Sequence, residues 1–485
     1  WKSGVSDITG DNAIFQKIKN SQWELKNYFN QLYTKEKYTW GIRLYIRYTH
    51  CPASLTVAHR NLPILFADNM LIANCIYHRN ELSSPDNISE NTYRTVIGQT
   101  HESILAEYEE MNTGNAYTDN VLYGMRKING VNYQLTGGFC GELSSVKQEN
   151  AYSAHSYSFY TVPRIEWERN VFLFTAATTV RWSHLPKQSY SRFCVSPFFC
   201  FRYKFTPRWK MSLLGSLDES EGGLKDIYPF RYREDYRTVV KHTGKVPVTV
   251  RQLYTCYLEY KNTIKEFFWT LSASYSHNRY NLITERNYKD GNFYLSSVER
   301  NHSSHSYTLN TIGSKGIYDW NLKTSLELTL ARNEGKQLNE GIVQDYRYDY
   351  LCIEPKIVWA PSVFFEAEYK ATVSCVGGGI GEDTSLDPLW EVAQRLTLSL
   401  EFHDTEFRLS GEHFYNDLSK NQHLNTWLAD VSLIHKVGKW RFAASAINLF
   451  NKEQYRYTLY SAVQSYTSWI KLRPREFMVS VQYQW

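Results

Sequence analysis

The chain has 485 residues, a formal net charge of +5 and 16% aromatic residues, with 38 Tyr against 5 Met. Many aromatic residues and a small net charge exclude a disordered chain, and the composition fits neither a collagen nor a disulfide scaffold. So mild a charge also gives no reason to expect a nucleic acid partner. A transmembrane helix needs about 18 consecutive apolar residues, and the best candidate, Leu62 to Tyr77, contains Asp68 and Asn69.

The first residue is Trp1, and no leader with a charged and then an apolar segment follows it. We therefore expect a signal peptide, and any other N-terminal segment, to lie upstream of Trp1. The eight Cys residues show no Cys-x-x-Cys spacing, so we expect neither a zinc site nor a redox motif. Cys194 and Cys200 share one predicted strand, about 20 Å apart, which is too far for a disulfide. A disulfide between Cys51 and Cys75 stays an open alternative.

The N-terminal quarter of the chain alternates only weakly between apolar and polar residues. We predict two hairpins there, one of 23–33 with 38–50 about Thr34 to Lys37, and one of 92–100 with 102–112. One further strand is predicted before the first hairpin.

From residue 120 onward, strict alternation marks the strands. A period of two places successive side chains on opposite faces, so each run is a strand with one apolar and one polar face. The apolar faces of the four clearest runs are Phe267, Trp269, Leu271, Ala273 and Tyr275; Trp320, Leu322, Leu326, Leu328 and Leu330; Phe365, Ala367, Tyr369, Ala371 and Val373; and Leu396, Leu398, Leu400 and Phe402.

Short turns join these strands into hairpins, and an Asn-Gly pair is the strongest signal of this kind. The turns are predicted at Asn129-Gly130, Glu168 to Asn170, Thr206 to Arg208, Asn262 to Glu266, Lys315-Gly316, Pro361-Ser362, Asp404-Thr405 and Lys436 to Lys439. The connections between hairpins are predicted to be long and polar, at 219–250, 279–301, 332–345, 376–389 and 451–470. Short and long connections therefore alternate along the chain.

This asymmetry indicates the fold class. Alternating strands of about ten residues, aromatic residues near strand ends, short turns on one side and long loops on the other are typical of an outer-membrane β-barrel. In lipid every backbone N–H and C=O must be paired, so the sheet must close. We predict an all-β, transmembrane antiparallel barrel over residues 1–485, with its apolar face against outer-membrane lipid. About 18 to 22 strands are expected, with 22 favoured, because bacterial barrels usually have an even number.

The last strand has an apolar face that ends on an aromatic residue. The residues of this face are Phe477, Val479, Val481, Tyr483 and Trp485. The pattern resembles the terminal assembly signal of outer-membrane barrels, which implies recognition by the barrel-assembly machinery during insertion. The alternative is an ordinary edge strand at the end of the chain.

Two further segments sharpen the resemblance. Ala446-Ile447-Asn448-Leu449-Phe450-Asn451-Lys452 comes before a Tyr/Ser-rich loop, and Leu472-Arg473-Pro474-Arg475-Glu476-Phe477 comes after it. An Asn-Leu-Phe-Asn run at the end of the penultimate strand, followed by an Arg-containing approach to the last strand, resembles the C-terminus of TonB-dependent outer-membrane receptors in their Bacteroidota form. Over the rest of the chain the resemblance is one of architecture.

The resemblance implies an N-terminal plug inside a 22-stranded barrel, and a TonB box on which a periplasmic energy-transducing protein pulls. Residues 1–22 are too short for these parts, and we interpret them as a plug remnant or the first strand. The plug is then expected to be absent from residues 1–485. TonB is an implied partner if a plug lies upstream of Trp1; the other reading is a relative without a plug.

Three functions stay open on this evidence. The first is a TonB-dependent transporter in the cell outer membrane that takes up a scarce or large ligand. The second is a non-transporting scaffold barrel that holds surface lipoproteins, and the third is a passive porin. The sequence contains no Gly-x-Ser-x-Gly, His-Glu-x-x-His or Walker motif, so we expect no enzyme, no cofactor and no metal site.

The connection 219–250 holds the candidate ligand or partner site, because aromatic side chains beside Arg suit sugar faces, peptides or a protein surface. The candidate residues are Tyr228, Phe230, Arg231, Tyr232, Arg233 and Tyr236. The alternative is a solvated outer loop with no ligand.

Other chemical signals have plainer interpretations. Gly377 to Gly381 lacks a Gly-Lys-Ser/Thr ending and is expected to be a flexible surface loop. The acidic run Glu382 to Asp387 lacks EF-hand spacing and is expected to be solvated rather than to hold Ca²⁺. His302 and His305 are expected on opposite faces of a strand, which does not suit a shared metal.

Charged residues within the strands are predicted to face the lumen. Their mixed signs suit ion selectivity in an open pore or contacts with a plug. They are Lys323, Glu327, Glu366, Glu368, Lys370, Glu401, Arg408 and Glu412.

Overall fold

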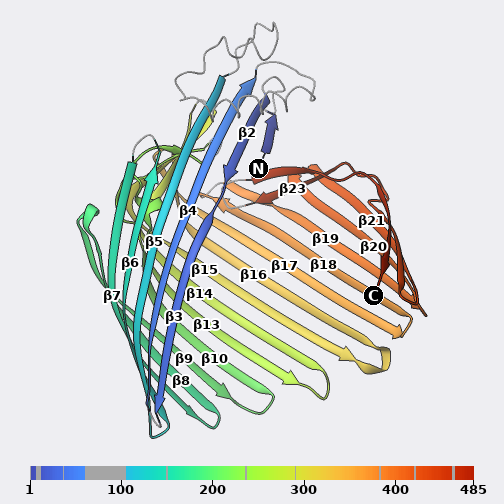
Figure 1. Ribbon diagram of the computed structural model, residues 1–485, viewed down its shortest axis with the longest axis horizontal. Helices are drawn as coiled ribbons and strands as arrows, with labels where there is room; N and C mark the ends of the chain where they lie inside the picture. Colours follow the sequence, from blue (N-terminus) through green and yellow to red (C-terminus); the bar gives the residue numbers. More distant parts are fainter. Residues whose placement is uncertain are drawn as a thin grey trace.

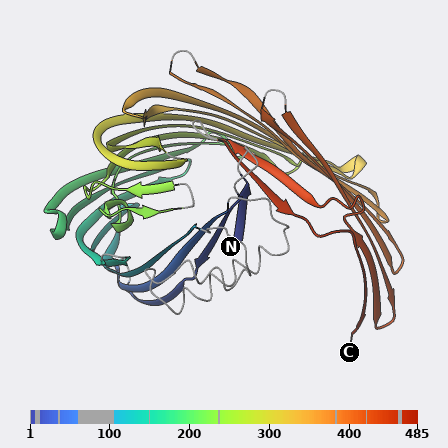
Figure 2. The ribbon, with the colours of Figure 1, turned by 90° about the horizontal axis from the view of Figure 1, so that it is seen from above.

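The computed structural model describes residues 2–6, 13–35, 38–60, 105–148, 151–234, 238–289, 291–381, 384–419, 422–460 and 465–484. Nearly all of them lie in strands, which form one tall, strongly curved wall (Figures 1 and 2). The predicted all-β, antiparallel fold class is confirmed.

The elements of the wall and its connections are β1 (Lys2–Ser6), β2 (Ala13–Asn20), β3 (Trp23–Lys35), β4 (Tyr38–Arg60), β5 (Leu105–Ile128), β6 (Val131–Lys147), β7 (Ala151–Arg169), β8 (Phe172–Leu185), η2 (Pro186–Gln188), β9 (Tyr190–Lys204), β10 (Trp209–Glu221), α3 (Leu224–Ile227), β11 (Tyr232–Arg233), β12 (Thr238–Lys241), β13 (Val248–Asn262), β14 (Phe267–Lys289), β15 (Asn292–Ile317), η3 (Tyr318–Trp320), β16 (Leu322–Asn339), β17 (Ile342–Ser362), β18 (Phe365–Ile380), β19 (Thr384–Phe402), β20 (Thr405–Ser419), β21 (Gln422–Val437), β22 (Trp440–Ile447), β23 (Gln454–Tyr460), β24 (Ser465–Lys471) and β25 (Glu476–Tyr483).

Each wall strand pairs antiparallel with the next wall strand along the chain. The β5–β6 ladder, for example, closes at Ile128↔Val131, directly at its turn. β10 pairs with β13 because β11 and β12 belong to the connection between them. β23 and β24 form a separate two-stranded sheet. The wall is therefore a long meander, with successive turns at opposite ends.

The ladders place apolar and polar residues in separate rows, as the alternation predicts. Leu309, Leu330 and Leu351 are neighbours across β15, β16 and β17. One residue further along, Asn310, Thr329 and Cys352 are neighbours on the opposite face. Leu330 is 40% exposed although it is aliphatic, which is the environment of a side chain that faces lipid. The polar row faces the other way.

The predicted short turns gather at the lower end of the wall in Figure 1. The turns at Asn129-Gly130, Thr206 to Arg208, Asn262 to Glu266 and Lys436 to Lys439 are confirmed. Asn129 and Gly130 have φ values of 49° and 83°, the left-handed pair that a two-residue hairpin needs. Three more of the eight turns, those predicted at Glu168 to Asn170, Pro361-Ser362 and Asp404-Thr405, lie one or two residues from their predicted positions, at 170–171, 363–364 and 403–404.

The turn predicted at Lys315-Gly316 is wrong. β15 continues through this pair to Ile317, and the chain turns at Tyr318 to Asn321, where Asn321 has a φ of 48°. Trp320 therefore belongs to the turn and not to the apolar face of a strand. Gly316 has a different role, because a Cβ at this position would collide with the carboxylate of Glu266.

The prediction of long, polar connections is also wrong for three segments. The segments 279–301, 332–345 and 376–389 consist mainly of strand extensions that meet at tight tips, so that β14 reaches Lys289 and β15 starts at Asn292. Gly377 to Gly379 accordingly lie in β18 rather than in a loop. Above the lipid both faces of a strand meet water, so the apolar alternation that identifies a strand disappears there.

The strand count agrees with the predicted range. The main sheet has 23 strands. β2 and β3 pair with successive parts of β4, so they are two parts of one wall strand. β11 and β12 belong to a connection. Without these three extra segments the described wall has 20 strands. The predicted hairpin of 23–33 with 38–50 is confirmed as β3–β4.

The strand directions restrict how the wall can close. β3 and β25 run in the same direction, since an even number of antiparallel steps separates them. Antiparallel closure therefore needs an oppositely directed strand between them, and β1 runs in that direction. Within the described ranges, β25 pairs with β22 alone. Figure 2 shows both ends of the curved wall at its open side.

Several predictions fall on residues outside the described ranges. These are the strand 92–100, Cys75, Tyr236, Glu382, Asp383 and Trp485. The seven described Cys residues, Cys51 among them, are free thiols. No helix in the described part of the chain is long and apolar enough to cross a membrane.

The Asn-Leu-Phe-Asn run forms a clamp between the ends of β22 and β25. The Nδ2 of the buried Asn448 donates to the carbonyl oxygens of Lys452 and Arg473, both at 2.8 Å, and its Oδ1 accepts from the Lys452 N–H at 2.9 Å. Asn451 accepts from the Arg475 N–H at 2.9 Å. Both Asn residues have positive φ. The run thereby fixes the backbone where the chain enters its last strand.

Replacing Asn448 with Ala is expected to destabilise this junction strongly. The change leaves partly buried peptide groups of Lys452 and Arg473 without these partners, each at a cost of up to about 1–3 kcal/mol. The matched control is Asn451→Ala, which removes one hydrogen bond at an exposed position with the same kind of φ. The free energy of unfolding, measured by urea titration in lipid vesicles, should fall clearly more for Asn448→Ala. Equal losses in the two variants would contradict the clamp.

Candidate functional site

The connection between β10 and β13, residues 222–247, folds back into the space that the wall encloses, and we call it the inner loop. Figure 2 shows β11 and β12 of this loop (light green arrows) inside the curve of the wall. The Gly222 N–H donates to the Pro247 carbonyl at 2.8 Å, which continues the β10–β13 ladder and closes the base of the loop. The loop therefore leaves the wall and returns to it at one point.

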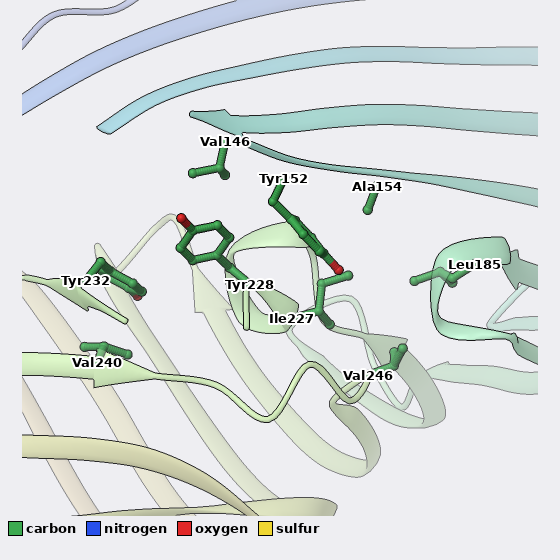
Figure 3. Packing of buried hydrophobic residues seen from close by; sticks show 9 residues of the cluster. All are labelled: Val146, Tyr152, Ala154, Leu185, Ile227, Tyr228, Tyr232, Val240 and Val246. Atoms are coloured by element: carbon green, nitrogen blue, oxygen red, sulfur yellow. The ribbon is translucent and has the colours of Figure 1, made fainter. Parts of the chain in front are cut away.

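The inner loop is held against the wall by a compact apolar cluster (Figure 3). Ile227 and Tyr228 are 1% and 2% exposed, whereas many large apolar side chains of the described wall strands are exposed. Burial of such side chains contributes about 1.5–3 kcal/mol each. The wall supplies Val146, Tyr152, Ala154 and Leu185 from β6, β7 and β8, and the loop supplies Ile227, Tyr228, Tyr232, Val240 and Val246.

Hydrogen bonds fasten the loop on two sides. The Tyr228 hydroxyl donates to Gln148 Oε1 at 2.9 Å, beyond the end of β6. On the far side, β12 pairs in parallel with Phe293 to Ser296 of β15. Near the base, Asn281 donates to the Val246 carbonyl at 2.9 Å and accepts from the Val248 N–H at 2.7 Å. The loop thus has fixed contacts with wall strands from β6 to β15.

The predicted ligand residues divide into buried and exposed ones. Tyr228 and Tyr232 lie in the cluster, and burial raises the pKa of Tyr232 to about 12. Phe230 is 37% exposed, and Arg231 is exposed with its guanidinium 5.0 Å from the Tyr294 ring centre. Arg233 is half-buried and donates to Asn292 at 3.5 Å. Of the described candidates, Phe230 and Arg231 are the ones that a ligand can reach in this structure.

The inner face of the wall next to the loop carries a cluster of charged residues that the sequence analysis did not predict. Arg181 pairs with Glu221 at 3.3 Å, and Arg192 pairs with Glu219 at 3.0 Å. Cys194, which is 2% exposed, lies opposite Arg181 in the β8–β9 ladder. These residues come from three strands, so only the ladder brings them together. Charges at alternate positions within apolar-looking strands are the one signal that could have indicated them.

Several of the predicted lumenal charges also have partners on neighbouring strands. Glu327 accepts from Asn310 at 2.8 Å, Glu368 pairs with Lys356 at 2.8 Å, and Glu412 pairs with Arg395 at 3.3 Å. Arg408 pairs with Glu406 of its own strand at 2.9 Å. The inner face is therefore a network of short polar contacts across strands. Such a face can line water or hold a polar protein segment.

The histidine spacing has the predicted consequence. His305 lies opposite His277 in the β14–β15 ladder, whereas His302 lies opposite Tyr280, on the other face of the sheet. Within the described ranges, no group of three or more His, Cys, Asp or Glu could hold a metal ion.

No protein-family model matches the sequence, and no curated protein matches it. Some solved structures are similar to this chain over most of its length. The ferric yersiniabactin uptake receptor FyuA from Yersinia pestis is 9% identical, with 99% of this chain and 78% of that one covered and a TM-score of 0.39. The ferric-catecholate import receptor Fiu from E. coli K12 is 10% identical, with 99% and 78% covered and a TM-score of 0.39.

The copper transporter OprC is also similar, with 8% identity, 97% of this chain and 81% of that chain covered, and a TM-score of 0.43. Each of these three TM-scores is below 0.5, so the likenesses carry no argument about what this chain binds.

Proposed function

We propose that this chain forms the barrel of an outer-membrane transporter of the TonB-dependent type, which takes up a ligand too scarce or too large for a general porin. The observation that carries the proposal is the two-faced wall. One face exposes aliphatic and aromatic side chains, and the other is bonded across strands by polar ones. That arrangement is stable with lipid on one side and water or a polar protein segment on the other.

The C-terminal segment supports the same proposal. Phe477, Val479 and Val481 are 76%, 79% and 55% exposed and continue the outer apolar face beside β22. The clamp at Asn448 and Asn451 gives a physical role to the motif that resembles the receptor family. Outer-membrane lipid and the barrel-assembly machinery are the partners that this strand requires.

The ligand contact is assigned to the exposed part of the inner loop, Phe230 and Arg231, with Arg233 and Tyr236 as neighbours in the sequence. An aromatic ring beside a guanidinium binds flat or anionic groups by stacking and charge. Energised uptake also requires a plug that carries a TonB box. The paired charges of the inner wall offer such a plug a polar surface.

The test is intact mass spectrometry and N-terminal peptide mapping of the protein purified from its native outer membrane, together with capture by the periplasmic domain of TonB. Peptides upstream of Trp1 and binding to TonB are the expected result. A native chain that begins near Trp1 and fails to bind TonB would overturn energised transport. Recovery of that chain with surface lipoproteins would instead support the non-transporting scaffold, and ion flow without partners would support a porin.

A further inference from the structure

The inner loop crosses the inside of the wall instead of lying along it. Its cluster contains Val146 of β6 and also packs against Met111 of β5 and Leu295 of β15. Between β5 and β15 the wall takes eight steps from strand to strand. At about 4.8 Å a step, this arc measures roughly 38 Å along the wall. The loop fills the inner side of that arc.

The contacts of the loop are those of a fixed structure. Its two least exposed residues, Tyr228 and Ile227, have the two largest fully buried side chains among the described residues. Tyr228 packs edge-on against Tyr152 of β7, with ring centres 5.8 Å apart. β12 is held in register by four residue pairs with β15. A mobile lid would have few buried contacts and few internal hydrogen bonds.

We infer that the inner loop is a permanent constriction of the lumen, built into the barrel wall and independent of any plug. The inference rests on the proposed outer-membrane barrel but not on energised transport. The loop narrows the passage on the side of β5 to β15 and presents Phe230 and Arg231 at its exposed surface. Solute must then pass between this surface and the opposite part of the wall.

The test compares ion conductance of the full chain 1–485 in planar lipid bilayers with that of a variant whose loop is shortened. Because Gly222 and Pro247 are hydrogen-bonded neighbours, residues 223–246 can be replaced by an Asn-Gly turn without a break in the β10–β13 ladder. Single-channel conductance is expected to rise severalfold in this variant. Equal conductance of the two folded proteins, whether both are open or both closed, would overturn the inference.

Point variants test whether the contacts that hold the loop against the wall, and not only the presence of the loop, determine the conductance. Tyr228→Ala removes the central ring and is expected to give a higher and more fluctuating conductance. Tyr228→Phe keeps the ring and loses the hydroxyl that donates to Gln148, so its conductance should stay close to that of the parent. Tyr254→Ala is the matched control, because this 48% exposed tyrosine lies opposite Tyr275 on the outer face.

The heat-dependent mobility of the barrel on gels reports that each variant is folded. A Tyr228→Ala barrel that is folded and conducts like the parent would contradict a constriction that this cluster holds in place. Failure of the native protein to bind TonB would remove energised transport and leave the conductance results unaffected. The two proposals can therefore fail separately.

Discussion

Deletion of the last strand, residues 476–485, is expected to abolish stable insertion into the outer membrane. β25 pairs with β22 along eight residues, from Trp440↔Tyr483 to Ile447↔Glu476. Without it, the N–H and C=O groups along this edge of β22 face lipid unpaired, at a cost of several kcal/mol for each group. The same deletion removes the apolar face that resembles the assembly signal. The measurement is the amount of folded, heat-modifiable protein in the outer-membrane fraction.

The matched control is a larger deletion near the same end of the chain. β23 and β24 form their own two-stranded sheet, and the Leu472 N–H donates to the Glu453 carbonyl at 2.9 Å across its base. Residues 454–471 can therefore be replaced by a short turn with the wall left intact, and this variant should still insert. Normal insertion of the chain without 476–485 would show that β25 is dispensable and would refute its role as the closing wall strand.

Leu326→Arg is expected to destabilise the barrel by about 2–4 kcal/mol, the cost of an Arg on the lipid face near the bilayer midplane. Leu326 is 51% exposed and lies between Gly313 and Pro355 of the neighbouring strands, on the face of the wall that also carries Leu328 and Leu330. A guanidinium there would lie within the apolar face, away from the carboxylates of the inner face. Urea titration in lipid vesicles gives the free energy of unfolding directly.

Thr329→Arg places the same side chain on the inner face of the same strand. Thr329 accepts a hydrogen bond from Asn310 at 2.9 Å, and Glu327, two residues away on the same face, supplies a carboxylate. The expected loss is about 1 kcal/mol, the value of the lost hydrogen bond. A larger loss for Thr329→Arg than for Leu326→Arg would mean that the two faces of the wall have been assigned the wrong way round.

The membrane-spanning part of the wall could be predicted from the sequence because its determinants are local. Lipid on one side and water on the other impose opposite demands on successive residues, so the rows through Leu330 and Thr329 can be read directly from the alternation. The Asn129-Gly130 turn is equally local, since two left-handed residues in sequence specify it. The turn at Tyr318 to Asn321 was missed because Gly316 serves a close contact with Glu266 instead.

The upper part of the wall could not be predicted in the same way. β14 and β15 extend to Lys289 and Asn292 through segments in which polar and apolar residues are mixed without strict alternation. No period of two therefore remains there to distinguish a strand from a loop. What specifies these extensions is the pairing of each strand with its neighbour, which a single sequence does not display.

The sequence by itself determined the all-β class, the two faces of the wall, most of its turns and the identity of the aromatic and basic residues at 228–236. Only the tertiary structure decided what those residues do. Tyr228 and Gln148 are 80 positions apart in the chain and hydrogen-bonded, and the side chains that bury Tyr228 come from β6, β7 and β8. The same composition would suit a solvated outer loop. The burial of Tyr228 inside the wall depends on the curvature of the wall and on long-range packing, and the alternation along one strand contains no information about either.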